Sequence, residues 1–249
     1  MSKATAFFLF IILLNFFSIL IFDKYKSYDK STVIIKPGMN LEEISKKLFS
    51  QKIIQNPNLF KIWVKISFSE KKLRYGEFIF EKSNSIYDVT KKLINGDVVF
   101  RKLTIIEGSY KYELLNILKE IDPQSSLEYH DVSDLIIADT YSYQVTDSAE
   151  KILSDIKKLS KDFSHKIWSE RDTSIPLKSI SEMFILASIV EKETAIKNEK
   201  PLISGVFYNR LKKNMRLQSD PTVIYSITEG KYKLKRKLAM AVVNLKIEN

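Results

Sequence analysis

The feature that most constrains this chain is an uninterrupted apolar run near its N-terminus. Residues Ala4–Phe22 contain no charged side chain and one strongly polar one, Asn15. As a helix these 19 residues would be about 28 Å long, close to the thickness of the hydrocarbon layer of a bilayer. No small-x-small cleavage site follows the run, which argues against a removable signal peptide. The run therefore predicts an uncleaved transmembrane anchor over residues 4–22.

The charges around this run leave its orientation open. Lys3 precedes the run, and Lys24, Lys26 and Lys30 follow it. A strict count of these lysines would not place the bulk of the chain outside the cell, but a long domain crosses the membrane largely regardless of its flanking charge. Residues 23–32 are charged and polar and predict a short stalk.

Composition excludes several classes of protein. The 249 residues include no cysteine, which rules out a disulfide framework, a cysteine-ligated zinc site and a thiol nucleophile. The only histidines, His130 and His165, are far apart in sequence and predict no metal site. The formal net charge of +10 favours an anionic partner. Because the lysines are scattered rather than clustered, an anionic polymer or lipid headgroups fit better than nucleic acid.

A strand–turn–helix unit recurs after the stalk. Asn40–Leu48 aligns without gaps on Ser85–Leu93, including the polar residue at the helix start and the Lys-Lys-Leu ending. In the first copy Glu43 follows Asn40 by three residues, which predicts a variant of the capping box. A third, looser copy starts at Leu103–Gly108. This repetition indicates duplication, and units of this kind serve either as structural spacers or as binders of polymers.

The first half of the chain thus predicts an α+β module and the second half a mainly helical domain. The strands expected are Val33–Lys36 and Tyr75–Glu81, with a turn at Pro37-Gly38 and a further helix at Asn58–Phe68. The helices expected in the second half are Ala149–Lys161, Asp162–Arg171, Lys178–Glu193, Ile203–Leu211 and Pro221–Thr228, with a loop at Asn214–Asp220. The overall fold class expected is α+β.

The segment Ser179–Glu193 is the best candidate for chemistry. Its apolar side chains surround nearly the whole helix, which predicts a buried helix. Glu191 continues one apolar line, and Glu193 lies about 200° further round, so the two carboxyls cannot share one cleft. A carboxyl that loses hydration there would suit proton donation near neutral pH. The alternative is that both glutamates form the solvated end of a core helix, neutralised by Lys192 and Lys197.

Hydrogen-bonding side chains are concentrated downstream of this helix. Aromatic and amide groups interleaved with a few charges suit the recognition of sugars. The candidates are Tyr208, Asn209, Arg210, Gln218, Ser219, Asp220, Thr222 and Tyr225. The alternative is an ordinary structural role, in which Asp220 caps the following helix and Arg210 pairs with it.

Three segments together resemble the endolytic murein transglycosylases, the YceG-like family. They are Leu186–Thr194 (LASIVEKET), Val206–Leu211 (VFYNRL) and Met215–Tyr225 (MRLQSDPTVIY). The resemblance implies a single membrane span, a LysM-like small α+β module and a catalytic domain outside the cytoplasmic membrane. On this chain those parts fall at 4–22, 32–103 and 104–249.

The resemblance also implies a reaction. Members cleave the β-1,4 bond between N-acetylmuramic acid and N-acetylglucosamine in nascent glycan strands and leave a 1,6-anhydromuramoyl end. Glu191 corresponds to the catalytic glutamate, which would act as both general acid and general base, with no metal and no cofactor. The downstream candidates above would line the glycan cleft. Asp139 and Tyr141 join them, because Val132–Tyr141 matches a family segment at its Asp-Thr-Tyr ending.

The resemblance further implies a location and partners. We expect a single-pass protein of the bacterial inner membrane with its catalytic domain on the extracytoplasmic side, acting on peptidoglycan strands beside cell-wall synthases. Family members continue through a Ser-Pro-Tyr-Asn-Thr-Tyr segment and a Gly-Leu-Pro-Pro-Gly loop, whereas this sequence ends at Asn249. The sequence therefore predicts a C-terminally truncated catalytic domain. The alternative function is a catalytically impaired protein that binds peptidoglycan or acts as a scaffold.

Overall fold

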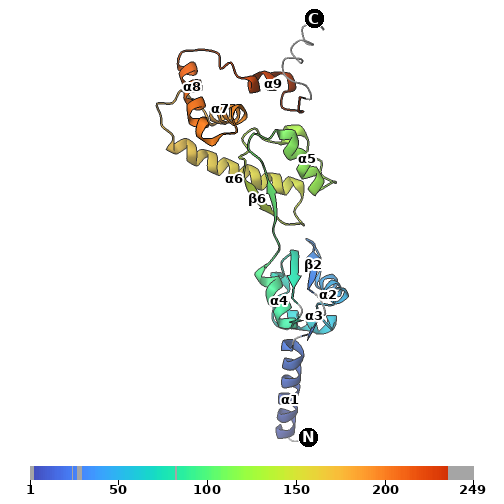
Figure 1. Cartoon of the computed structure of the whole chain (residues 1–249). Coiled ribbons are helices and arrows are strands. Elements are labelled where there is room, and N and C mark those ends of the chain that lie inside the picture. The colour runs from blue at the N-terminus through green and yellow to red at the C-terminus, as the bar shows by residue number, and fades with distance from the viewer. Residues whose placement is uncertain (1–2, 24, 27–29, 82, 235–249) are drawn as a thin grey trace. The chain divides into compact units, whose positions relative to one another are not determined.

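The chain folds as a mixed α/β protein that is mostly helical (Figure 1). This computed structural model describes residues 3–23, 25–26, 30–81 and 83–234. The described residues divide into two compact units. Unit 1 takes those up to Arg101 together with Ser142–Thr146, and unit 2 takes Lys102–Tyr141 and those from Asp147 onward.

The core of unit 1 is built on a two-stranded antiparallel sheet. Strand β2 (Ser31–Ile35) pairs with β3 (Gly76–Phe80), with Val33 opposite Phe78. Side chains alternate along each strand, so that Val33, Ile35, Phe78 and Phe80 all enter the core. Both strands lie where the repeat predicts them, and the strands of the first two copies pair with each other.

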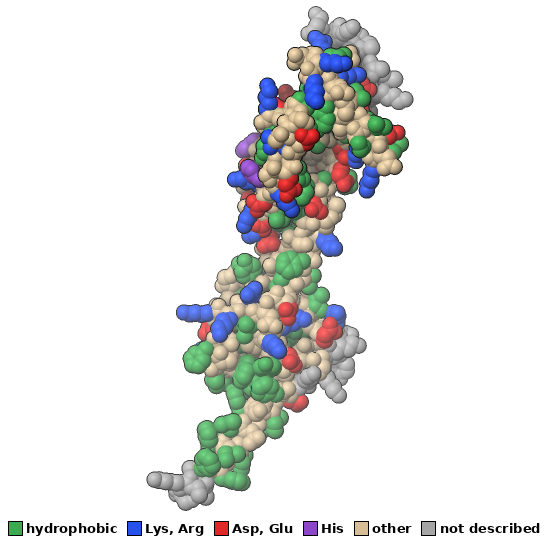
Figure 2. All heavy atoms as spheres, turned by 90° about the vertical axis from the view of Figure 1, so that its left-hand side faces the viewer, with side chains coloured by type: hydrophobic (Ala, Val, Ile, Leu, Met, Phe, Trp, Pro, Cys, Tyr) green, Lys and Arg blue, Asp and Glu red, His purple; other side chains and the backbone are tan. Residues whose placement is uncertain are grey.

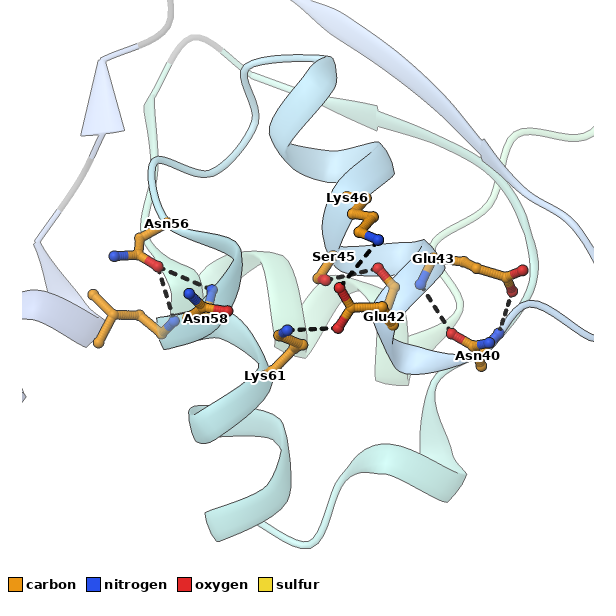
Figure 3. A network of polar contacts seen from close by, with 9 residues as sticks. Asn40, Glu42, Glu43, Ser45, Lys46, Asn56, Asn58 and Lys61 are labelled. Carbon is orange, nitrogen blue, oxygen red and sulfur yellow. Dashed lines mark hydrogen bonds and ion pairs between the residues drawn. The ribbon is translucent and has the colours of Figure 1, made fainter.

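Helices α2 (Leu41–Ser50) and α4 (Ile86–Asn95) begin in the same way. The Asn40 side chain accepts a hydrogen bond from the Glu43 amide at 3.0 Å, and the Glu43 carboxylate accepts one from the Asn40 amide at 2.8 Å (Figure 3). Ser85 and Asp88 make the equivalent pair of bonds at 3.0 and 3.1 Å. The capping box predicted for the first copy is confirmed and recurs in the second.

Helix α3 (Pro57–Ile66) packs beside α2, close to the predicted range. Its residues Phe60 and Val64 are buried in the core of unit 1. On the outer side, the Lys61 ammonium lies 2.5 Å from the Glu42 carboxylate of α2 (Figure 3). This contact, helped by Lys46, lowers the pKa of the exposed Glu42 carboxyl. The α2–α3 pair is therefore joined by an apolar core and an outer ion pair.

The apolar run forms helix α1 (Lys3–Phe22). Its C-terminal end packs into unit 1, where Ile21 is fully buried and the Phe22 ring lies 5.8 Å from that of Trp63. Further toward the N-terminus hydrophobic side chains such as Phe8 and Phe16 are exposed (Figure 2). Within the part of the chain that the structure describes, no helix combines the length and hydropathy needed to cross a membrane. The predicted anchor over residues 4–22 stays a prediction.

The predicted stalk over residues 23–32 is partly regular structure. Strand β1 (Tyr25–Lys26) pairs antiparallel with β4 (Ser83–Asn84), just before α4. Ser31 and Thr32 already belong to β2. The residues of the predicted stalk therefore include parts of two strands, because backbone pairing does not require an apolar pattern. A short 3₁₀ turn, η1 (Glu70–Lys72), precedes β3.

Unit 2 is mainly helical. Strand β5 (Arg101–Thr104) pairs with β6 (Thr140–Tyr143) and leads to α5 (Lys111–Ile121). The residues expected to form two helices, 149–161 and 162–171, form one 22-residue helix, α6 (Ala149–Glu170). The remaining elements are η2 (Tyr129–Asp131), α7 (Ile180–Glu193), η3 (Lys197–Glu199), α8 (Lys200–Lys212) and α9 (Asp220–Thr228).

Candidate functional site

Helix α7 presents the predicted acid at its C-terminal end. The helix begins at Ser179, whose side chain accepts a hydrogen bond from the Glu182 amide at 3.1 Å. Leu186, Ile189 and Val190 pack with Phe207 of α8 in a small core. The prediction that this helix is buried on all faces is wrong. Among the residues of unit 2 that the structure describes, Ile185 of α7 is 57% exposed. Only the stripe that faces α8 and its neighbours is covered.

Glu191 lies at the border of this core and is bound by a cation. Its side chain is 27% exposed, and both carboxylate oxygens accept hydrogen bonds from the Lys200 ammonium, at 2.7 and 2.6 Å. Lys200 is the first residue of α8. The neutralising partners that the sequence predicts are Lys192 and Lys197, and Lys200 is not among them. The Glu191 carboxyl is therefore half-buried, as expected. Its surroundings include the Lys200 ammonium as well as apolar side chains.

The loop after β5 lies against the same end of α7. Gly108 has φ +73°, and a Cβ placed on it would lie 3.5 Å from Glu191 Cγ and 3.1 Å from Lys192 Cε. Both the backbone conformation and the close approach therefore favour glycine at this position. The Lys192 ammonium lies 4.6 Å from the centre of the Tyr110 ring, which stacks on Tyr112. Partial burial raises the pKa of the Tyr110 phenol.

Glu193 has a different partner from Glu191. Ser219 is buried, and its hydroxyl donates a hydrogen bond to the Glu193 carboxylate at 2.8 Å. The residue before it, Gln218, has a left-handed backbone with φ +54°, a conformation that is unfavourable for residues other than glycine. The hydrogen bond thus joins the end of α7 to a strained segment of the Gln-Ser-Asp-Pro-Thr string. The two carboxyls face separate groups, in agreement with their helical spacing.

The structure places the other predicted site residues in varied surroundings. Tyr208 packs partly against the α7–α8 core, and the Thr222 hydroxyl donates to the Ser219 carbonyl at 2.6 Å. Arg210 donates to the Leu217 carbonyl rather than pairing with Asp220, and Ser219, not Asp220, stands at the cap position of α9. The exposed members of the set are Asn209, Gln218, Asp220, Tyr225 and Asp139. Their contact with a glycan stays a prediction.

Tyr141 is the member of the set with the clearest interior role. Its side chain is buried, and its hydroxyl donates to the Ile137 carbonyl at 2.7 Å and lies 3.2 Å from the Ser160 hydroxyl of α6. Burial raises the pKa of the Tyr141 phenol, and the hydrogen bond with Ser160 partly opposes that rise. These contacts join the start of β6 to α6.

A shallow pocket of about 350 Å³ lies at the other end of α7. Its lining includes Ile180, the first residue of α7, and Lys161 and His165 of α6. Glu191 comes eleven positions after Ile180 on this helix, a rise of roughly 16 Å along the axis. The pocket is therefore distinct from the Glu191–Lys200 pair. Across the described residues, no group of three or more His, Cys, Asp or Glu side chains could hold a metal ion.

Two curated proteins that this chain is similar to are both named endolytic murein transglycosylase. The endolytic murein transglycosylase of Bacillus subtilis is 24% identical, and the match covers 82% of this chain and 65% of that protein. The one from Streptococcus pneumoniae is 23% identical, and the match covers 78% of this chain and 43% of that protein. The matched part of this chain thus spans between 43% and 65% of the length of these curated relatives.

A solved structure and a family model complete the comparison. The crystal structure of a YceG-like protein from Listeria monocytogenes is 24% identical, with a TM-score of 0.39 and coverage of 86% of this chain and 80% of that one. The family model described as the YceG-like family matches residues 33–248, which is most of the sequence. The extent of that match shows that the chain belongs to the YceG-like family.

Proposed function

We propose that this protein is a murein transglycosylase that uses Glu191 as its acid and base. The observation that carries the proposal is the half-buried Glu191 carboxyl at the end of α7, which lies beside the Gly108 loop. Glu193, two residues on, joins the strained Gln218–Ser219 segment to the same end of the helix. The names of the curated relatives support peptidoglycan as the substrate.

One carboxyl is enough for this chemistry. In the reaction that we propose, protonated Glu191 donates its proton to the oxygen of the β-1,4 bond between N-acetylmuramic acid and N-acetylglucosamine as the C1–O bond breaks. The sugar's own acetamide stabilises the positive charge that develops at C1. The Glu191 carboxylate then removes the proton of the C6 hydroxyl as that oxygen attacks C1 and closes the 1,6-anhydro ring. No water is consumed, so the second carboxylate of an ordinary glycosidase is not required.

We also propose that the protein acts at the extracytoplasmic face of the bacterial inner membrane, as a single-pass protein working with cell-wall synthases. The exposed hydrophobic side chains of α1 and the formal net charge of +10 support a membrane anchor next to an anionic polymer. The 4–22 anchor and the 32–103 LysM-like module belong to this proposal.

Digestion of purified glycan strands tests the proposed activity. The protein should release fragments with 1,6-anhydromuramoyl ends, which mass spectrometry distinguishes from hydrolysed ends by the missing water. Glu191→Gln should abolish these products, a loss of at least about 10²-fold expected for a missing general acid. Glu120→Gln, an exposed carboxyl of α5 in the same unit, is the matched control and should retain full activity. Undiminished cleavage by Glu191→Gln would reject Glu191 as the acid.

The alternative function is binding of peptidoglycan without cleavage. It would show as retention of the protein on insoluble peptidoglycan, with no anhydro-ended fragments released by the unmodified chain. In that case Glu191→Gln should be retained as well as the unmodified chain. The same samples therefore decide between an enzyme and a binding or scaffold protein.

A further inference from the structure

The shallow pocket at the N-terminal end of α7 is lined on one side by cationic and donor groups of α6. Lys157, Lys161 and His165 follow one another at intervals of four residues, so they share one face of that helix. No acidic residue is among the described residues that line the pocket, and none of the three side chains forms an ion pair with another described residue. Asp134, which lies between two lining residues in sequence, is paired with Lys111 at 3.1 Å. The pocket therefore presents hydrogen-bond donors that the described part of the chain leaves without an anionic partner.

The rest of the lining suits a small apolar group. Leu135 and Ile180 contribute apolar side chains. The Ser164 hydroxyl is buried and donates to the Ser160 carbonyl, so its hydrogen is already used. The volume, about 350 Å³, is at the lower end of the range for small-ligand sites. A carboxylate with a small apolar group beside it, such as the C-terminal end of a peptide that ends in alanine, has the chemistry to bind there.

The pocket and Glu191 lie on the same side of α7. Eleven positions turn a helix by about 1,100°, which is three full turns and about 20°, so Ile180 and Glu191 project in nearly the same direction. Between them on this side, Phe184 is half-buried and Ala187 is exposed, whereas Leu186 on the opposite side is buried. The side of α7 that runs from Glu191 to the pocket is therefore partly open to solvent over roughly 16 Å.

We propose that this pocket binds a free carboxylate of the peptide stem that a muramyl sugar carries. This inference rests on the proposed function, because it needs a muramyl sugar at Glu191. The lactyl group of that sugar is joined to the stem by an amide, so the free carboxylates belong to amino acids further along the stem. A stem of about five residues reaches roughly 17 Å when extended, which matches the rise from Glu191 to Ile180. The donors of α6 bind the carboxylate, and the apolar lining contacts the small side chain beside it.

The pocket thus adds recognition of the peptide to recognition of the sugar. Glycan strands without stems, and neutral glycans such as chitin, offer no carboxylate to the donors of α6. Strands that carry stems should therefore bind, and be cleaved, in preference to bare strands. Because Lys161 and His165 are exposed, the contact is screened by water, and the expected preference is about fivefold.

Calorimetric titration of the full chain measures this preference. The probe is the disaccharide of N-acetylglucosamine and 1,6-anhydromuramic acid, which has no muramyl-to-glucosamine bond to cleave. It is used with a five-residue stem, with the same stem after its carboxyls are converted to amides, and without a stem. The form with free carboxylates should bind about fivefold more tightly than the other two. Added salt should reduce this difference, because it screens the contact between the carboxylate and the lysines.

Variants of α6 locate the carboxylate. Lys161→Gln should reduce the preference from about fivefold to about twofold, and Lys161→Arg, which keeps the charge, should retain most of it. Lys166→Gln is the matched control, because this exposed lysine of the same helix lies about 140° round from Lys161 and does not line the pocket. It should show the preference of the unmodified chain. In the digestion of glycan strands, the ratio of the rates on peptide-bearing and bare strands should fall in Lys161→Gln and not in Lys166→Gln.

Two results would overturn the proposal. Equal or undetectable binding of the three probes would remove the role of the carboxylate, and an undiminished preference in Lys161→Gln would place the carboxylate outside this pocket. If either occurs while bare strands are still cleaved to anhydro ends, the proposed function survives and this inference fails. If no probe binds and no strand is cleaved, both fail. Should Lys161→Gln not fold, His165→Gln on the same face of α6 replaces it, with the same expected loss of preference.

Discussion

At the scale of single residues, the hydroxyl of Tyr141 has a role that can be measured apart from sugar binding. It joins the Ile137 carbonyl to the Ser160 hydroxyl inside unit 2. Tyr141→Phe should lower the free energy of unfolding by about 1 kcal/mol at pH 7, because one buried acceptor loses its donor. Denaturant titration measures this change. A Tyr141→Phe variant with unchanged stability and weakened glycan binding would instead support the predicted role in the cleft.

The raised pKa of Tyr141 also predicts how stability depends on pH. Burial favours the neutral phenol, so the contribution of Tyr141 is fully present below the pKa of an unfolded tyrosine, about 10. It should be lost as pH rises through the higher pKa of the folded state. The unfolding free energy of the unmodified chain should therefore fall more steeply above about pH 10 than that of Tyr141→Phe. Parallel slopes would show that another tyrosine causes the fall.

The positions of side chains within one helix were easier to predict than their partners from other segments of the chain. Periodicity was enough to place Glu191 and Glu193 on different sides of α7. The partner of Glu191 was not predictable, because Lys200 belongs to the next helix, α8, which follows η3. Ser219 as the partner of Glu193 likewise depends on a left-handed Gln218 that no local signal indicated.

At the scale of elements, the capping boxes show where sequence is a sufficient guide. Their bonds join residues three apart, so the pattern around Asn40 and around Ser85 determines them locally. Asn40→Ala and Ser85→Ala should each lower the stability of unit 1 by about 1 kcal/mol. Denaturant titration checks both, and Asn116→Ala, within the exposed face of α5, should have a smaller effect. Equal losses of stability in all three variants would mean that the capping hydrogen bonds add no more stability than an exposed side chain does.

The Gly108 loop gives a prediction that links an element to the candidate site. Gly108→Ala should lower stability by about 1 kcal/mol or more, because φ is +73° and the new Cβ would press on the Lys192 side chain. Cleavage of glycan strands should fall further than stability alone explains, since Glu191 Cγ lies beside the same position. Gly205→Ala in α8 is the matched control, because its Cβ meets nothing within 4 Å. That substitution should leave stability unchanged or slightly raised.

The course of the long elements was less accessible from sequence. Helix α6 continues through residues 161–162, where the apolar pattern weakens and the sequence predicts a division into two helices. Helix α7 is apolar nearly all round, yet Ile185 is exposed. Periodicity reports which side chains share a face, but which faces acquire neighbours depends on tertiary packing, which one sequence does not reveal.

At the scale of the whole molecule, the absence of cysteine makes the proposed location testable. A single Lys119→Cys substitution places one thiol on the exposed side of α5. If unit 2 is extracytoplasmic, a membrane-impermeant maleimide should label this variant in intact cells. Ser2→Cys, on the other side of the apolar run, should be labelled only after the cells are permeabilised. Labelling of Lys119→Cys only after permeabilisation would reverse the proposed orientation.

The division into units has a consequence for how this protein could be rearranged by recombination. Ser142–Thr146 belongs to unit 1, although residues of unit 2 lie on both sides of it in the sequence. A single genetic crossover near codon 102 would transfer unit 2 together with five residues that belong to unit 1. Gene fusions that exchange the two halves of such a protein should therefore survive only when the recipient supplies a matching segment, so the halves are expected to be inherited together.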